Sequence, residues 1–208
     1  KDGHHPILFM QCGPVRHRVT ARAQAATRPF EHFVLVQPTT FQPARAADPD
    51  KRVEFQALYQ ELINDEARNR RIVVDIVESV NHGRSPLVLT ERNDHLDCLE
   101  RLLAPHVRHL VVLRAGMGKK RRQAVADQLA AIPTGDGRVI LATGKHVGEG
   151  FDDACLDTLF LTLPVSWRGT IAQYAGRLHR RHDGKREVRV YDYADVNVAM
   201  LGRMFDRR

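Results

Sequence analysis

An alternation of two hydrophobic patterns after residue 86 constrains the fold more than any other feature of the chain. Short, continuous apolar runs alternate with longer stretches in which apolar residues recur every three or four positions. The first pattern is typical of a strand buried on both faces, and the second of an amphipathic helix. The predicted strands are Leu87–Leu89, Leu110–Leu113, Val139–Leu141, Leu159–Leu161 and Val188–Tyr193. We therefore expect an α/β domain with three layers, in which a parallel sheet carries helices on both faces.

The spacing of apolar residues also predicts where the helices lie. One precedes the first of these strands, with Asn64 or Asp65 as its N-cap and Gly83 where it should stop. The predicted helices cover residues 72–80, 96–103, 119–131, 171–178 and 196–205. In parallel sheets of this kind, ligands bind at the carboxyl ends of the strands. The loops that follow the strands are therefore the first place to look for functional residues.

The chain before residue 51 has the features of a connector. The segment 42–50 is small, polar and interrupted by prolines, as in a loop or linker. Two short apolar runs before it, Pro6–Met10 and Phe33–Val36, are predicted strands, too few for an independent domain. We expect a short strand-containing connector over residues 1–50 and the main domain over residues 51–208.

The composition excludes several classes of protein. Apolar residues make up 43% and charged residues 27%, as in ordinary globular proteins. No apolar run approaches the roughly 20 residues that cross a bilayer, so we expect no membrane partner. The three cysteines lie far apart without a C-x-x-C pair, which disfavours a disulfide framework and favours a cytoplasmic location. The eleven histidines show no metal-ligand spacing, so no metal site is predicted, and no G-x-x-x-x-G-K-[ST] phosphate loop is present.

The clearest local feature is a basic stretch on the predicted helix 171–178 and just after it. Arg177 and Arg180 are three residues apart, so their guanidinium groups leave the same helix face. Gln173 lies one turn earlier. This face offers planar donors suited to an anion such as a terminal phosphate, but a solvated basic helix end would have the same spacing.

A second feature is the glycine-rich stretch that follows the strand ending at Leu141. Gly144, Gly148 and Gly150 allow backbone amides to approach a ligand closely, and Thr143 and Asp152 add a hydroxyl and a carboxylate. A glycine-rich turn without a ligand is the alternative interpretation.

Together these features resemble the second RecA-like domain of superfamily 2 helicases. Gln173-x-x-Gly176-Arg177-x-x-Arg180 resembles their motif VI, and Thr143 through Gly150-Phe151-Asp152 resembles motif V. Leu87–Thr90 resembles motif IV, and Arg114–Met117 resembles the glycine-containing loop after the next strand. The resemblance spans about residues 70–195. The opening of the chain resembles the segment downstream of motif III in helicases of the DNA-repair and restriction-motor type, which implies that residues 1–50 include the end of a first helicase domain.

The resemblance implies how nucleotide would be handled. ATP would lie between two RecA-like domains, with magnesium held by the first domain, whose phosphate loop this chain lacks. Arg180 would act as the arginine finger and Arg177 would contact the γ-phosphate, with Gln173 near the phosphates. Gly150 and Asp152 would contact the ribose or couple the nucleotide site to the nucleic-acid surface. The chain alone would therefore be inactive as an ATPase.

The resemblance also implies a nucleic-acid partner, with DNA favoured and RNA left open. Thr90, Gly116 and Thr143, at or just after strand ends, would contact the sugar-phosphate backbone. Residues 84–208 carry +6 of the net charge of +7, which agrees with a polyanion partner. Lys119–Arg122 is either a phosphate-contacting stripe or a solvated helix face. The leading hypothesis is the C-terminal motor domain of an ATP-dependent DNA helicase or translocase. A non-catalytic nucleic-acid-binding module, or the motor of a restriction or defence complex, are the alternatives.

Overall fold

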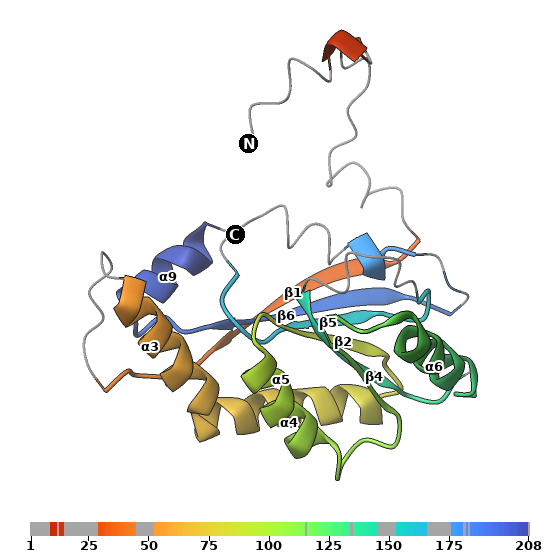
Figure 1. Ribbon diagram of the computed structural model, residues 1–208, viewed down its shortest axis with the longest axis horizontal. Coiled ribbons are helices and arrows are strands. Elements are labelled where there is room, and N and C mark those ends of the chain that lie inside the picture. The colour runs from red at the N-terminus through yellow and green to blue at the C-terminus, as the bar shows by residue number, and fades with distance from the viewer. Residues whose placement is uncertain are drawn as a thin grey trace.

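Six parallel strands form a single sheet in the computed structural model (Figure 1). The structure describes residues 9–11, 13–14, 29–44, 52–114, 116–133, 135–144, 153–165, 176–180, 182 and 184–207. The strands are β1 (Glu31–Pro38), β2 (Pro86–Thr90), β3 (Leu110–Leu113), β4 (Val139–Thr143), β5 (Thr158–Leu161) and β6 (Glu187–Ala194). Their order across the sheet is β1-β6-β5-β2-β4-β3. All five strands predicted after residue 86 are confirmed.

Five helices with defined bounds accompany this sheet in the described part of the chain. They are α3 (Arg52–Asn64), α4 (Glu66–Asn81), α5 (Asn93–Leu103), α6 (Lys119–Ala130) and α9 (Ala199–Asp206). Asp65 caps α4 by accepting a 2.7 Å hydrogen bond from the backbone N–H of Arg68. Gly83 follows the end of α4 with a φ of 74°, a left-handed conformation that suits glycine. Both predicted signals of this helix are therefore confirmed. None of the helices in the described part of the chain has the length and apolar character needed to cross a membrane.

The predicted three-layer arrangement is confirmed by the two cores on either side of the sheet. Leu87 and Leu89 of β2 face one side, where Val125 and Leu129 of α6 pack. Val88 faces the other side, which α4 and α5 cover. Successive residues of each strand point to opposite faces, so a strand buried on both faces must be apolar at every position. This explains the continuous apolar runs of the sequence.

A third core forms beyond the carboxyl ends of the strands. Leu58 and Leu62 of α3 pack there with Leu201 of α9, and Phe41 and Leu163 join them from the segments after β1 and β5. The sequence interpretation did not include α3. This helix nevertheless covers part of the edge at which ligands of parallel sheets usually bind.

The strand predicted around residues 33–36 is an edge strand of the same sheet. β1 pairs in parallel with β6 along its whole length, from Glu31 opposite Glu187 to Pro38 opposite Ala194. The sheet therefore includes a strand that precedes residue 51. The assignment of the earlier residues to the end of a first helicase domain stays a prediction.

The prediction of a strand at Pro6–Met10 is wrong for residues 9 and 10, which are the part of it that the structure describes. Residues 9–11 are helical, and the N–H of Gly13 donates a 2.9 Å hydrogen bond to the carbonyl of Phe9, four residues earlier. Gly13 has a φ of 74°. A glycine in this conformation ends a helical turn more readily than it follows a strand, because it satisfies the last carbonyls of the turn. Residues 6–8 lie outside the described part.

Candidate nucleotide and nucleic-acid sites

The three residues predicted to contact nucleic acid lie where the parallel strands end. We call this end of the sheet the carboxyl edge. Thr90 ends β2 and Thr143 ends β4, and the two residues are paired in the parallel register. Gly116 follows β3, the next strand, with a φ of 78°. The carboxyl ends of parallel strands meet at one edge, which explains why positions far apart in the sequence come together.

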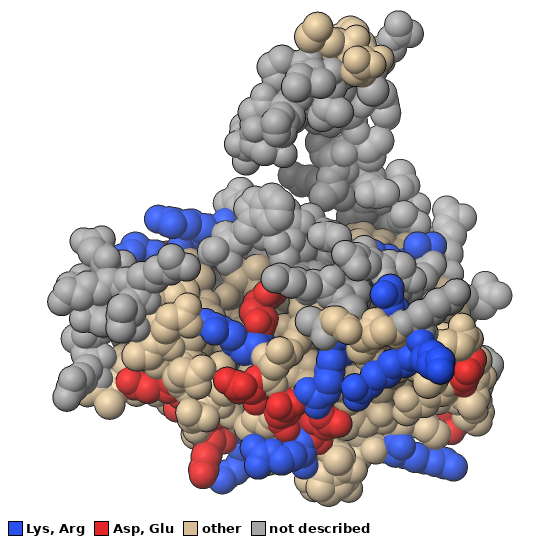
Figure 2. Space-filling model, in the orientation of Figure 1, with Lys and Arg blue, Asp and Glu red and all other residues tan. Residues whose placement is uncertain are grey.

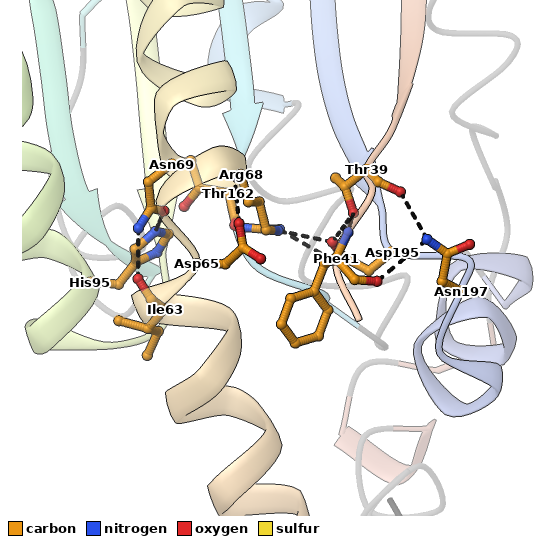
Figure 3. Close-up of polar contacts among 10 residues, drawn as sticks. All are labelled: Thr39, Phe41, Ile63, Asp65, Arg68, Asn69, His95, Thr162, Asp195 and Asn197. Carbon is orange, nitrogen blue, oxygen red and sulfur yellow. Dashed lines mark hydrogen bonds and ion pairs between the residues drawn. The ribbon is translucent and has the colours of Figure 1, made fainter. Parts of the chain in front are cut away.

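A buried chain of hydrogen bonds lies directly behind Thr90. The Asn69 side-chain amide donates to the carbonyl of Ile63 at 2.7 Å, so its oxygen faces His95 (Figure 3). His95 Nε2 lies 3.0 Å from that oxygen and must donate to it. In neutral His95, Nδ1 is then the acceptor, and the hydroxyl of Thr90 donates to it at 3.0 Å.

This arrangement limits what the Thr90 side chain can offer at the edge. A hydroxyl has one proton, and that of Thr90 is directed inward to His95. Its oxygen also accepts the backbone N–H of Arg92 at 3.4 Å, and only 1% of the residue is exposed. A contact from Thr90 to a phosphate would therefore need its backbone or a rearranged side chain.

Burial sets the charge state of His95. Loss of solvation, followed by the nearby positive charge of Arg68, lowers the pKa of His95 from 6.5 to about 3. The unfolded chain therefore binds a proton between about pH 6.5 and pH 3 that the folded protein does not bind. Acidification through this window must favour unfolding.

We expect His95→Gln to reduce this loss of stability in acid. From pH 7 to pH 4.5, the wild-type protein should lose about 2 to 3 kcal/mol more unfolding free energy than the variant, because glutamine has no proton to bind. Urea unfolding followed by circular dichroism at both pH values measures the difference. Equal losses in the two proteins would contradict a buried neutral His95.

A buried ion pair joins α4 to the ends of three strands. Arg68 Nε donates to Asp195 Oδ1 at 2.9 Å, and the two side chains are 1% and 0% exposed. Arg68 Nη1 donates to the carbonyl of Thr162 at 2.7 Å, and the hydroxyl of Thr39 donates to the same Asp195 oxygen at 2.5 Å (Figure 3). Thr39, Thr162 and Asp195 directly follow β1, β5 and β6. This network fixes the carboxyl edge from within.

Thr143 differs from Thr90 in the state of its hydroxyl. Only 6% of the residue is exposed, and its Oγ1 has no hydrogen-bond partner within the part of the chain that the structure describes. A buried hydroxyl without a partner is unfavourable by about 1–3 kcal/mol. An acceptor oxygen brought to this edge would remove that cost.

The start of α6 adds donors and positive charge next to Gly116. Gly118 precedes the helix and has no side chain with which to cap its first backbone N–H groups. Lys120, Arg121 and Arg122 in the first turn are exposed. Lys and Arg side chains gather near α6 in Figure 2, whereas basic and acidic side chains mix near α5. The start of α6 thus combines two features that attract anions.

Arg114, between β3 and Gly116, is not available to a ligand in the same way. Its guanidinium forms ion pairs with both Asp97 and Glu100 of α5. The hydrogen bond to Asp97 is the main cause that raises the pKa of Arg114. These pairs attach the loop that leads to Gly116 to the neighbouring helix.

The described part of the predicted phosphate-binding segment lies away from this edge. Leu178 is buried in the same core as Phe30, which immediately precedes β1. The ring of His179 lies 4.8 Å from that of His32, near the start of β1, in an edge-on arrangement. Residues 176–180 therefore lie near the amino ends of the strands. The structure does not bring Arg177 and Arg180 together with Thr90 and Thr143.

The remaining predicted site residues, Gly150, Asp152 and Gln173, lie outside the described residues. Two cavities that described residues line lie elsewhere. One of about 570 Å³ lies between α4 and α5 beside Val74 and Leu102, and one of about 190 Å³ lies near the amino ends of the strands beside Arg138 and Cys155. Neither of these two cavities is lined by a predicted site residue.

Sequence reasoning missed the residues that hold the carboxyl edge and segment 176–180 in place. These residues are Thr39, Arg68, Asn69, His95, Thr162, Lys185 and Asp195. Arg68 and Asp195 are 127 positions apart, so no local spacing connects them. Thr39, Thr162 and Asp195, however, come within three residues of the ends of predicted strands. Polar residues at strand ends were therefore the signal that was available.

The parallel strand order and the helices on both faces define an α/β domain of the RecA-like type. No known protein-family model matches the sequence, and no curated protein matches it. Solved structures with a similar fold include T4 UvsW, with a TM-score of 0.64 and 16% identity over 86% of this chain and 38% of that one. The C-terminal part of the Fun30 ATPase domain has a TM-score of 0.58 and 15% identity over 70% of this chain and 46% of that one. The Sulfolobus solfataricus SWI2/SNF2 ATPase core domain has a TM-score of 0.58 and 11% identity over 86% and 42%. The chain thus spans less than half of each of these structures.

Proposed function

We propose that this chain is the C-terminal motor domain of an ATP-dependent helicase or translocase that acts on DNA. The proposal rests on the order of the helicase-like motifs along a RecA-like fold, with Thr90, Gly116 and Thr143 at one edge of the sheet. Two of the similar structures are described as ATPase domains, which agrees with this class. The motor of a restriction or defence complex is a special case of the same proposal.

The nucleotide in this proposal is bound mainly by another domain. The chain has no phosphate loop, and residues 176–180 lie away from the carboxyl edge. A triphosphate with its magnesium would therefore have to be presented by a first RecA-like domain facing Arg177 and Arg180. Arg180 would place its guanidinium beside the transferring phosphoryl group and stabilise the negative charge there. Arg177 would contact the γ-phosphate. Gln173, Gly150 and Asp152 keep their proposed roles at the phosphates and the ribose.

The nucleic-acid surface in this proposal follows the carboxyl edge from β4 to α6. The Thr143 hydroxyl and the backbone at Gly116 would donate to phosphate oxygens. Lys120 and Arg121 would add attraction that depends on ionic strength. None of these groups reads a base, which suits a motor that must move along any sequence.

A non-catalytic nucleic-acid-binding module is the second candidate. The absence of a phosphate loop from the sequence favours it, because the chain alone lacks the groups that hold magnesium and ATP. The two candidates share the nucleic-acid surface and differ in ATP turnover. Nucleic-acid-stimulated ATP hydrolysis by the full-length protein therefore decides between them.

We expect the chain to bind single- and double-stranded DNA with an affinity that falls as salt rises. Lys120→Ala and Arg121→Ala should each reduce the slope of log affinity against log salt concentration by about 1, because each removes one phosphate contact. Fluorescence anisotropy with labelled DNA at several salt concentrations measures the slope, and RNA of the same sequence tests the alternative partner.

Arg186→Ala is the matched control for this binding experiment. Arg186 is an exposed cation that immediately precedes β6, at the opposite end of the strands, so its loss should leave the slope unchanged. Equal slopes in all three variants would contradict the proposed surface at α6. No binding to DNA or RNA at low salt would contradict both candidate functions.

A further inference from the structure

The ammonium group of Lys185 is surrounded by backbone carbonyls. Nζ donates hydrogen bonds to the carbonyl oxygens of Ala154 at 2.8 Å, Leu178 at 3.0 Å and Arg180 at 2.8 Å. An ammonium group has three protons, and all three are used. Lys185 is therefore committed to holding the backbone and has no donor left for a ligand.

Two of these carbonyls belong to the segment that carries the predicted phosphate-binding arginines. Residues 176–178 are helical, and the N–H of His179 bonds to the carbonyl of Gly176 at 3.3 Å. The last carbonyls of a helix lack partners within the helix, and a cation placed there stabilises them. Lys185 supplies this cation from a position that follows the helix in the chain.

A tight turn brings Lys185 back to the helix end. The backbone N–H of Lys185 donates to the carbonyl of His182 at 3.1 Å, and Gly184 within the turn has a φ of 91°. A side chain at position 184 would be strained in this conformation. Both residues are therefore needed. Gly184 adopts the backbone conformation of the turn, and Lys185 then contacts the carbonyls at the helix end.

Aromatic rings next to β1 also contact Lys185 and this segment. Lys185 Nζ lies 5.8 Å from the ring centroid of Phe30, within the range of a cation–π contact. The ring of His179 lies 6.2 Å from Phe30 and 4.8 Å from His32. Segment 176–180 is thus attached both to the loop before β5, through Ala154, and to the start of β1.

We infer that Lys185 is a positioning residue that fixes the direction in which Arg177 and Arg180 are presented. The inference rests on the proposed function for the role of the two arginines, whereas the attachment itself rests on the contacts above. An arginine finger must be placed within about 1 Å of its productive position, since such a displacement can reduce the rate about 10²-fold. Lys185 acts through the backbone of the segment and touches no reacting atom.

Hydrogen–deuterium exchange of the protein tests the attachment directly. Lys185→Met keeps the apolar stem and removes the three donors, so amides of residues 176–182 should exchange at least about 10-fold faster, while those of β2 and β4 are unchanged. Arg186→Met, which removes an exposed cation next in the chain, is the control and should exchange as the wild type does. Wild-type exchange in Lys185→Met would overturn the inference.

If Lys185→Met does not fold, Lys185→Arg is measured instead, because a planar guanidinium cannot match three converging carbonyls. Faster exchange limited to the segment supports the inference, and wild-type exchange overturns it.

ATP turnover by the full-length protein tests the consequence. Lys185→Met should lower kcat about 10- to 100-fold with little change in KM for ATP or in DNA affinity, because the arginines are misplaced and not removed. Faster exchange with unchanged kcat would overturn the positioning role. If Arg180→Ala also hydrolyses ATP at the wild-type rate, the arginine-finger assignment within the proposed function fails, and the exchange result still decides whether Lys185 holds the segment.

Discussion

Replacing Arg180 by alanine in the full-length protein is expected to lower DNA-stimulated ATP turnover about 10³-fold. The guanidinium would neutralise charge that develops on the phosphoryl group only during its transfer, so its loss should reduce kcat far more than the affinity for ATP. Steady-state hydrolysis at saturating DNA, with kcat and KM measured separately, is the appropriate assay.

Two controls make the Arg180 result specific. Arg186→Ala removes a nearby exposed cation and should leave kcat within about 2-fold of the wild type, since surface charges away from a site have small effects. The 208-residue chain alone, which has no phosphate loop, should show no turnover with or without the substitution. A wild-type kcat in Arg180→Ala would remove the arginine-finger assignment, even if DNA binding is intact.

The largest effect on stability is expected from Asp195→Ala. The substitution leaves the guanidinium of Arg68 buried, with 1% of its side chain exposed, and without its counter-charge. Removing one partner of such a buried pair typically costs about 3–5 kcal/mol. Thr39 loses its acceptor on Asp195 as well, so the ends of β1 and β6 should loosen together. Urea unfolding at pH 7 measures the loss.

Matched variants separate burial from charge at this pair. Arg108 pairs with Asp136 at the surface, where the two side chains are 82% and 37% exposed, so Arg108→Ala should cost only about 0–1 kcal/mol. The double substitution Arg68→Met with Asp195→Leu should be less destabilising than Asp195→Ala alone, because no unpaired charge remains buried. A loss below about 1 kcal/mol for Asp195→Ala would show that Arg68 finds other solvation.

The elements of the fold that the sequence predicted are those in which burial dictates a regular pattern. β2 through β5 are apolar at nearly every position because helices cover both faces of the sheet. α3 shows the limit of our interpretation, since Leu58 and Leu62 repeat at helical spacing but lie in a segment next to the expected connector. β1 was predicted as a strand, but its pairing with β6 depends on partners at the far end of the chain.

The candidate site was less predictable because its chemistry depends on the direction of side chains. The resemblance marked Thr90 and Thr143 as equivalent strand-end hydroxyls. The structure shows one hydroxyl engaged by His95 and the other without a partner among the described residues. The commitment of Thr90 depends on Asn69 and His95, which come from two different helices. Periodicity gives the face of a helix but not the proton that each ring nitrogen carries.

The position of β6 between β1 and β5 has a consequence for how the protein folds during synthesis. Among the six described strands β1 is made first, but β6, the strand with which it pairs, is made last. The central strands can assemble while β1 waits unpaired, with Val34 and Val36 exposed to other chains. Strands so distant in sequence pair slowly, because the chain loses the entropy of closing a long loop before any stabilising contact forms. We therefore expect the pairing of β1 with β6 to be the last step in the assembly of this sheet.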